Sequence, residues 1–214
     1  MISNRTDMDT FTCIVKIAAM VILFSASFGC SKTIMHLKYG LTQPKDETPA
    51  TLLQFLEKHH FPTDNQYMFA DSGSFFGSVK SPLFLKHMLN HMIFDREGTM
   101  LVRDTTQCQW SGFDKIKFLS PDSTYEKCNE LKLDSVIRRI HPVIGNSLKD
   151  DSEMEADFTI VVTWAKFIGT YNYRLFNLED AVNQNKSASI RLIWLNVDMQ
   201  KSWKLSRKQK MAIK

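Results

Sequence analysis

The chain has 214 residues, of which 43% are hydrophobic and 23% charged, as in an ordinary globular protein. Its net charge of +4 is a mild excess, which argues against a nucleic-acid-binding protein. The sequence has no P-loop, no dinucleotide-binding fingerprint and no Gly-X-Ser-X-Gly elbow, so the enzyme classes that depend on these motifs are not indicated.

The first residues are typical of a targeting segment. An apolar core at 17–24 is followed by small residues up to Gly29, and it is too short for a spanning helix of about 20 residues. This pattern predicts a signal peptide over residues 1–29. Gly29-Cys30 resembles a bacterial lipoprotein box, in which the cysteine is lipidated and becomes the first residue; so loose a match fits the Bacteroidetes. The alternatives are ordinary signal-peptidase cleavage nearby or an uncleaved anchor.

Lipidation of Cys30 implies a protein anchored to the membrane of the bacterial cell envelope and facing the oxidising periplasm. Cys13 leaves with the signal peptide, so Cys108 and Cys128 remain. These two cysteines predict one disulfide, which closes a loop of about 20 residues and adds roughly 3 kcal/mol of stability. The alternative is two separate buried thiols.

After a polar tether at 30–48, one domain is expected over 49–214. Thr48 is a helix cap and Pro49 suits the first helical turn, so a helix is predicted from Pro49 to His60. The following elements are expected in chain order: a strand at 67–70, a loop at 71–77 and a short helix at 82–89.

Residues 90–103 predict a β-hairpin, because two apolar runs flank the four-residue connection Asp95–Gly98. The rest of the N-terminal part, 49–150, holds a predicted helix at 124–140 with a broad apolar stripe. An acidic loop at 145–156 follows. The chain ends in a basic amphipathic helix at 202–214, whose cations either touch anionic lipid or form a solvated face.

The most informative stretch is 157–200. Asp157–Ala165 is an apolar, β-branched run that predicts a strand buried on both faces. A Trp-Ala turn, a helical pattern and a second strand at 189–198, ending Asn-Val-Asp, follow it. This succession resembles the thioredoxin-like superfamily, over about a fifth of the chain, and places a core βαβ unit within 157–214.

The resemblance implies a site from which the chemistry is missing. The two cysteines of the family's Cys-X-X-Cys fall on Ile168 and Tyr171, and Val162 replaces the acid that assists proton transfer. No proline follows Pro142, where the family's cis-proline normally lies downstream of the site. The chain is thus similar to the membrane-tethered envelope thioredoxins of the TlpA type, with redox activity lost. The degenerate site comprises Trp164, Ile168, Gly169, Thr170 and Tyr171.

The predicted fold class is α/β: a thioredoxin-like three-layer α/β/α sandwich with an N-terminal extension. In that family the hairpin comes after the βαβ half, whereas here it precedes the Trp-Ala strand. Two arrangements follow from this order. The first is a permuted fold, in which the hairpin fills the late-strand positions of the sheet. The second is a separate N-terminal α/β layer beside a truncated thioredoxin core.

The expected function is that of a redox-inactive envelope lipoprotein that binds a protein or peptide partner or scaffolds, with no cofactor, metal or nucleic acid. The helix start near Tyr171 either offers free N–H groups to a peptide or anion, or Ile168 and Tyr171 plug the old cleft. A rival hypothesis is a thiol-disulfide oxidoreductase that uses Cys108 and Cys128. A third is a metal site at His87 and His91, which have helical i, i+4 spacing but lack a metalloprotease glutamate.

Overall fold

The computed structural model describes residues 40–101, 115–144 and 156–211. The helices of these ranges are α2 (Pro49–Lys58), α3 (Ser72–Val79), α4 (Pro82–His87), α6 (Leu133–Ile137), α7 (Tyr171–Phe176), α8 (Leu178–Gln184) and α9 (Arg207–Met211), with the 3-10 turns η3 (Lys166–Ile168) and η4 (Lys201–Trp203). The strands are β1 (Gln66–Phe69), β2 (His91–Asp95), β3 (Thr99–Leu101), β4 (Lys127–Lys132), β5 (Ile140–Pro142), β6 (Phe158–Trp164) and β7 (Ile190–Asn196). None of the helices described in these ranges has the length and apolarity needed to cross a bilayer.

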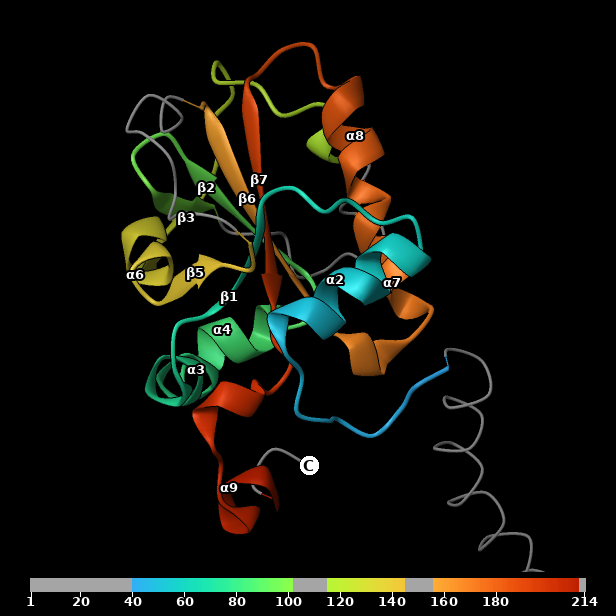
Figure 1. The fold of residues 1–214 in the computed structure, drawn as a ribbon. Helices are drawn as coiled ribbons and strands as arrows, with labels where there is room; N and C mark the ends of the chain where they lie inside the picture. Colours follow the sequence, from blue (N-terminus) through green and yellow to red (C-terminus); the bar gives the residue numbers. More distant parts are fainter. Residues whose placement is uncertain (1–39, 102–114, 145–155, 212–214) are drawn as a thin grey trace, which may run out of the picture. The chain divides into compact units, whose positions relative to one another are not determined.

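These strands form one mixed sheet in the order β4-β3-β2-β6-β7-β1-β5 (Figure 1). The three strands β6, β7 and β1 are parallel neighbours, and β6 pairs with β7 from Phe158↔Ile190 to Trp164↔Asn196. The other pairs are antiparallel: β2 with β6, β3 with β2, β4 with β3, and β5 with β1. The carboxyl ends of β6 and β7 therefore meet at one edge of the sheet, next to each other.

The two central parallel strands carry the core. Every residue of β6 is buried, as predicted for a strand covered on both faces. In β7, burial is complete from Ile193 to Asn196, at the end that lies beside Trp164. Trp164 and Trp194 are among the largest fully buried side chains, so this end of the sheet is shielded from water by two tryptophan rings.

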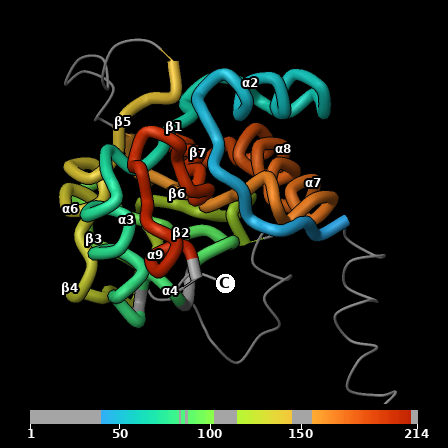
Figure 2. Tube along the Cα trace, turned by 60° about the horizontal axis from the view of Figure 1, so that its bottom comes forward, coloured from blue at the N-terminus to red at the C-terminus, as the bar shows by residue number. Residues whose placement is uncertain are grey.

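Helices pack against both faces of the sheet. On one face, Phe55 of α2 stacks on Trp164 at 6.0 Å, and Phe176 of α7 lies 4.7 Å from Trp194. On the other face, Phe69 of β1 contacts Phe75 of α3 at 5.5 Å, and also α4 through a further ring contact. Figures 1 and 2 show α2, α7 and α8 gathered on one side of the strands and α3 with α4 on the other. The fold is therefore α/β, as predicted.

The β2–β3 hairpin forms where the sequence predicted one. The Asp95 carboxylate accepts hydrogen bonds from the Thr99 amide at 2.8 Å and from the Glu97 amide at 3.1 Å, and so closes the turn. Gly98 has a φ of +71°, a conformation that glycine adopts without steric cost. Because β2 pairs with β6 over five residues, the hairpin belongs to the same sheet as the Trp164 strand and is not a separate layer.

The helix predicted over 124–140 is wrong for most of its length. Residues Lys127–Lys132 form the edge strand β4, only Leu133–Ile137 are helical, and Ile140 begins β5. Strand β4 alternates little in burial, because most of its side chains are exposed and only Leu131 is buried. Pairing with β3 therefore decides its conformation, against the local helical pattern.

Two further predictions are corrected. Residues expected as a loop at 71–77 lie largely in α3, which the Asp71 carboxylate caps by accepting from the Ser74 amide at 2.7 Å. The terminal helix expected over 202–214 is reduced to η4 and the short α9 within the described residues. The start of α2 is as predicted, since the Thr48 hydroxyl accepts from the Thr51 amide.

Candidate functional site

The carboxyl ends of β6 and β7 form the candidate site, because ligands of open α/β sheets bind at this edge. Trp164 ends β6 and is fully buried, held by Phe55 and Phe176. Its indole Nε1 has no hydrogen-bond partner among the described residues, so ring packing alone holds it. The chain then turns through Ala165 into η3 and α7.

The residues that the sequence analysis assigned to a degenerate thioredoxin site lie at this turn. Ile168 ends η3 and is only 3% exposed, so the first position that the resemblance aligned with Cys-X-X-Cys holds a buried aliphatic side chain. Gly169 has a φ of +55° and separates η3 from α7, which starts at Tyr171 after Thr170. No thiol is present at these positions, and disulfide exchange requires one.

Asn172 ties the first turn of α7 to the Trp-Ala turn. Its side chain is fully buried, and its Nδ2 donates to the Ala165 carbonyl at 2.8 Å. Asn172 was not identified from the sequence as part of a site. A polar residue within an otherwise apolar helix face was the signal available.

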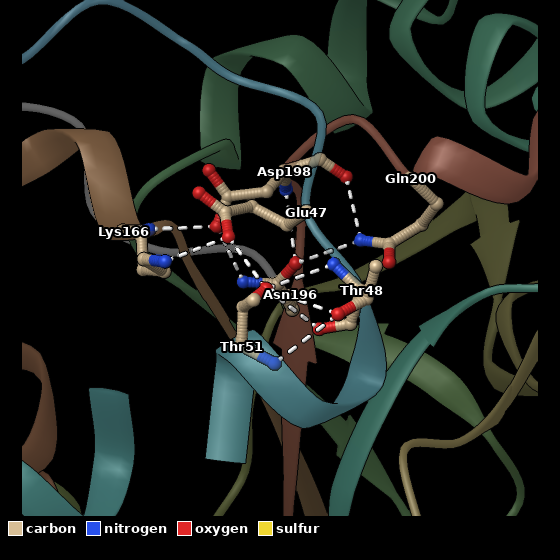
Figure 3. A network of polar contacts seen from close by, with 7 residues as sticks. All are labelled: Glu47, Thr48, Thr51, Lys166, Asn196, Asp198 and Gln200. Atoms are coloured by element: carbon tan, nitrogen blue, oxygen red, sulfur yellow. Dashed lines mark hydrogen bonds and ion pairs between the residues drawn. The ribbon is translucent and has the colours of Figure 1, made fainter. Parts of the chain in front are cut away.

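A buried acid, Asp198, lies just beyond the end of β7. It is 2% exposed, and its Oδ2 accepts from the Lys166 backbone N–H at 2.7 Å and from Asn196 Nδ2 at 2.8 Å (Figure 3). Burial raises the pKa of Asp198 to about 6, although both hydrogen bonds and the Lys166 charge oppose the shift. The Glu47 carboxylate adds to the increase.

Glu47 brings a second carboxylate to this edge from the N-terminal side of the domain. Its Oε2 accepts from Lys166 Nζ at 2.6 Å and from Thr51 Oγ1 at 2.7 Å. Glu47 is 7% exposed, so the ion pair with Lys166 is largely shielded from solvent. Lys166 thus contacts both acids, Asp198 through its backbone and Glu47 through its side chain (Figure 3).

Residues 42–47, called here the covering segment, run across this edge of the sheet. The Thr42 amide donates to the Phe167 carbonyl at 2.8 Å, which fixes one end of the segment to η3. At the other end, the Glu47 amide donates to Met199 O at 2.7 Å and Glu47 O accepts from the Lys201 amide at 2.8 Å. These contacts form a parallel bridge, so the last residues of the segment expected to be a tether lie against the candidate site.

Asn196 and Gln200 complete the hydrogen-bond network around Asp198. Asn196 Oδ1 accepts from the Asp198 amide at 3.1 Å and from Gln200 Nε2 at 3.4 Å. Gln200 Nε2 also donates to the Asp198 carbonyl at 3.0 Å. All three side chains are at most 2% exposed. The Asn-Val-Asp strand end was noted in the sequence as a resemblance, whereas the bridge between Glu47 and Gln200 just beyond it had no local signal.

An aromatic cluster lies beside the site, on α7 and the end of α2. Tyr173 is 43% exposed, its hydroxyl lies 3.0 Å from His59 Nδ1, and its ring packs on the edge of Phe61 at 4.7 Å. Burial lowers the pKa of His59, with help from the neighbouring Lys58 charge, so the neutral imidazole faces the phenol at neutral pH. An exposed tyrosine backed by packed rings suits contact with another protein.

The other predicted site residues lie elsewhere. Cys128 is half-buried on β4 and has no disulfide partner among the described residues, and Cys108 and Cys30 lie outside them, so the disulfide and the lipidation stay predictions. His87 ends α4 and His91 begins β2, so the two histidines do not share a helix. Across the described ranges, no group of three or more His, Cys, Asp or Glu side chains is placed to hold a metal ion.

The candidate site is therefore a buried polar network in which none of the described side chains is a thiol, covered by a segment of its own chain. Its two acids and one lysine are arranged to hold chain segments together, and its neighbouring surface is aromatic. No protein-family model, curated protein or solved structure matches this chain.

Proposed function

We propose that this protein is a cell-envelope lipoprotein, acylated at Cys30, whose thioredoxin-like domain performs no thiol chemistry and instead binds a protein or peptide partner. One observation carries the proposal. At Ile168, where the resemblance places a catalytic cysteine, the side chain is aliphatic and buried, and residues 42–47 are hydrogen-bonded to the adjacent Phe167.

The order and sense of four strands support a thioredoxin-like domain. In that family a hairpin lies on the far side of the strand that precedes the catalytic turn. Here the hairpin β2–β3 pairs antiparallel with β6, and β7 is parallel to β6 on its other side. The hairpin precedes β6 in the chain, so the proposed domain is a permuted α/β/α sandwich with helices on both faces.

Loss of redox activity follows from the side chains at the turn. A thiol-disulfide exchanger needs a thiolate at a helix start, where the helix dipole lowers the thiol pKa. Ile168 and Tyr171 offer no such group, and Val162 is a fully buried apolar residue where the family has an acid. Binding is the function that remains for this edge, and Tyr173 with His59 supplies its exposed aromatic contact.

The anchoring half of the proposal is tested by mass. We expect protein extracted from native membranes to begin at Cys30 and to carry acyl chains. The same sample, alkylated with and without prior reduction, reports on Cys108 and Cys128: modification only after reduction indicates the disulfide. An unlipidated full-length chain with both thiols freely alkylated would contradict the proposal and favour the rival oxidoreductase, which a disulfide-reductase assay then tests directly.

The binding half is tested by placing a photo-crosslinking amino acid at Tyr173 in cells. We expect a discrete crosslinked species with a partner protein. Phe118 is a matched control, since it is also an exposed aromatic residue, at 77% exposure, and belongs to a different part of the chain. Equal crosslinking from both positions, or none from Tyr173, would contradict a binding surface beside the degenerate site.

A further inference from the structure

The end of the chain carries a concentrated positive charge. Residues 199–214 contain six lysines and arginines and no acid, and they more than account for the net charge of +4, because the rest of the chain has two more acids than bases. Within the described residues the cations are on and around η4 and α9. Lys201, Lys204, Arg207 and Lys208 are exposed, and Lys210 is half-buried. These five residues are called here the basic face.

Contacts with the domain hold the basic face in place. The Trp203 ring packs 5.3 Å from Phe75 of α3, and the Lys201 amide donates to Glu47 O at 2.8 Å. Lys210 forms an ion pair with Asp46. Figure 1 shows α9 projecting from the sheet beyond the end of β7. The segment that carries the cations is therefore packed against the domain, close to Asp46 and Glu47 near the start of the domain.

That position determines what the basic face meets. Eleven residues, 31–41, separate Cys30 from Thr42, and a chain of this length reaches about 40 Å at most. An acyl chain on Cys30 keeps the domain within that distance of the bilayer, at a high effective concentration of lipid. Asp46 forms an ion pair with Lys210, and Glu47 forms a backbone bridge with Gln200. The basic face therefore lies next to the point where the chain arrives from the membrane.

We propose that the basic face binds the anionic headgroups of the membrane in which the protein is anchored. The inference rests on the proposed function, because it is the Cys30 anchor that brings the bilayer into reach. Each lysine or arginine near an anionic surface strengthens membrane binding by about fivefold at moderate salt, and the attraction decays within a Debye length of about 10 Å. An acyl tether fixes only the distance of the domain, whereas this second contact fixes its orientation.

The test uses unacylated mature chain, residues 31–214, which includes the whole compact unit from Thr42. Its partition is measured by co-sedimentation with vesicles of phosphatidylcholine alone and with vesicles that also contain phosphatidylglycerol. We expect binding to the anionic vesicles only, and loss of that binding in about 1 M salt, where the Debye length is about 3 Å.

The variant Lys204→Gln/Arg207→Gln/Lys208→Gln removes three exposed cations and spares both Trp203 and Lys210. We expect its partition to fall by about a hundredfold. The control Lys58→Gln/Lys115→Gln/Arg138→Gln removes the same charges from exposed positions on other elements, and we expect a change of less than about fivefold. Circular dichroism confirms that both variants are folded.

Equal losses in the two variants, or equal binding to neutral and anionic vesicles, would overturn the inference. Since the vesicle assay uses chain without an acyl group, its result is independent of Cys30. Failure of lipidation is read from the mass of native protein, so the two proposals fail separately.

Discussion

Replacing Asp198 with asparagine should change how stability depends on pH. The pKa of Asp198 is about 6 in the folded protein, against 3.8 as its ordinary value. The folded chain therefore holds a proton that the unfolded chain releases between these values. Asp198 contributes stability that is fully present below pH of about 3.8 and is lost as pH rises through about 6. A gap of about two pKa units corresponds to about 3 kcal/mol.

Asp198→Asn removes this titration and keeps an oxygen that accepts from the Lys166 amide and from Asn196 Nδ2. Any constant change in packing shifts the free energy of unfolding equally at every pH. We therefore expect the stability of the variant relative to wild type to rise by about 3 kcal/mol between pH of about 3.5 and 8. Urea denaturation followed by tryptophan fluorescence measures both proteins across this range.

A second variant, Asp122→Asn, removes an exposed carboxylate from a loop and separates burial from the general loss of one negative charge. A stability difference for Asp198→Asn that is flat with pH, or that falls as pH rises, would refute the assignment of Asp198 as a buried acid of raised pKa. A pH-dependent difference of equal size in Asp122→Asn would do the same.

Three further results are expected. Lys166→Met leaves the buried Glu47 carboxylate without its cation and should destabilise the protein by about 3 kcal/mol. A double-mutant cycle with Glu47→Gln should give a coupling energy of at least about 1 kcal/mol, and the absence of coupling would refute the role of this ion pair. Gly98→Ala should cost about 1–2 kcal/mol by thermal unfolding, because the turn has positive φ and a Cβ would lie 3.3 Å from Leu133 Cβ, whereas a neutral result would contradict this geometry. Ile168→Cys/Tyr171→Cys should form an internal disulfide on mild oxidation, detected by thiol alkylation and mass, and a pair that stays reduced would argue against a thioredoxin-like turn at these positions.

The central strands and the hairpin could be predicted because their signals are local. An unbroken β-branched run at 157–165 gives a strand buried on both faces whatever it pairs with, and the Asp95–Gly98 connection closes a hairpin on its own. The Thr48 cap at the start of α2 is local in the same sense.

The edge strand β4 could not be predicted in this way, because its conformation depends on pairing with β3. Most of its side chains are exposed, so its sequence shows no alternation of apolar and polar residues that would indicate a strand. Only one part of the candidate site, the turn after Trp164, could be predicted from the sequence. The turn after Trp164 was predicted from its resemblance to the thioredoxin-like superfamily. The ion pair between Glu47 and Lys166 joins residues 119 apart in the sequence, and no local pattern near either residue predicts it.

The covering segment also determines how the domain responds to mechanical load. A pull on the chain before Thr42 first strains the single hydrogen bond to Phe167 O, and then the bonds that Glu47 makes with Met199 and Lys201. Rupture of these bonds and of the ion pairs that Asp46 and Glu47 make with Lys210 and Lys166 would release six residues, which span about 20 Å when extended. Under tension from the N-terminal side, the covering segment would therefore detach before the strand pairs of the sheet separate.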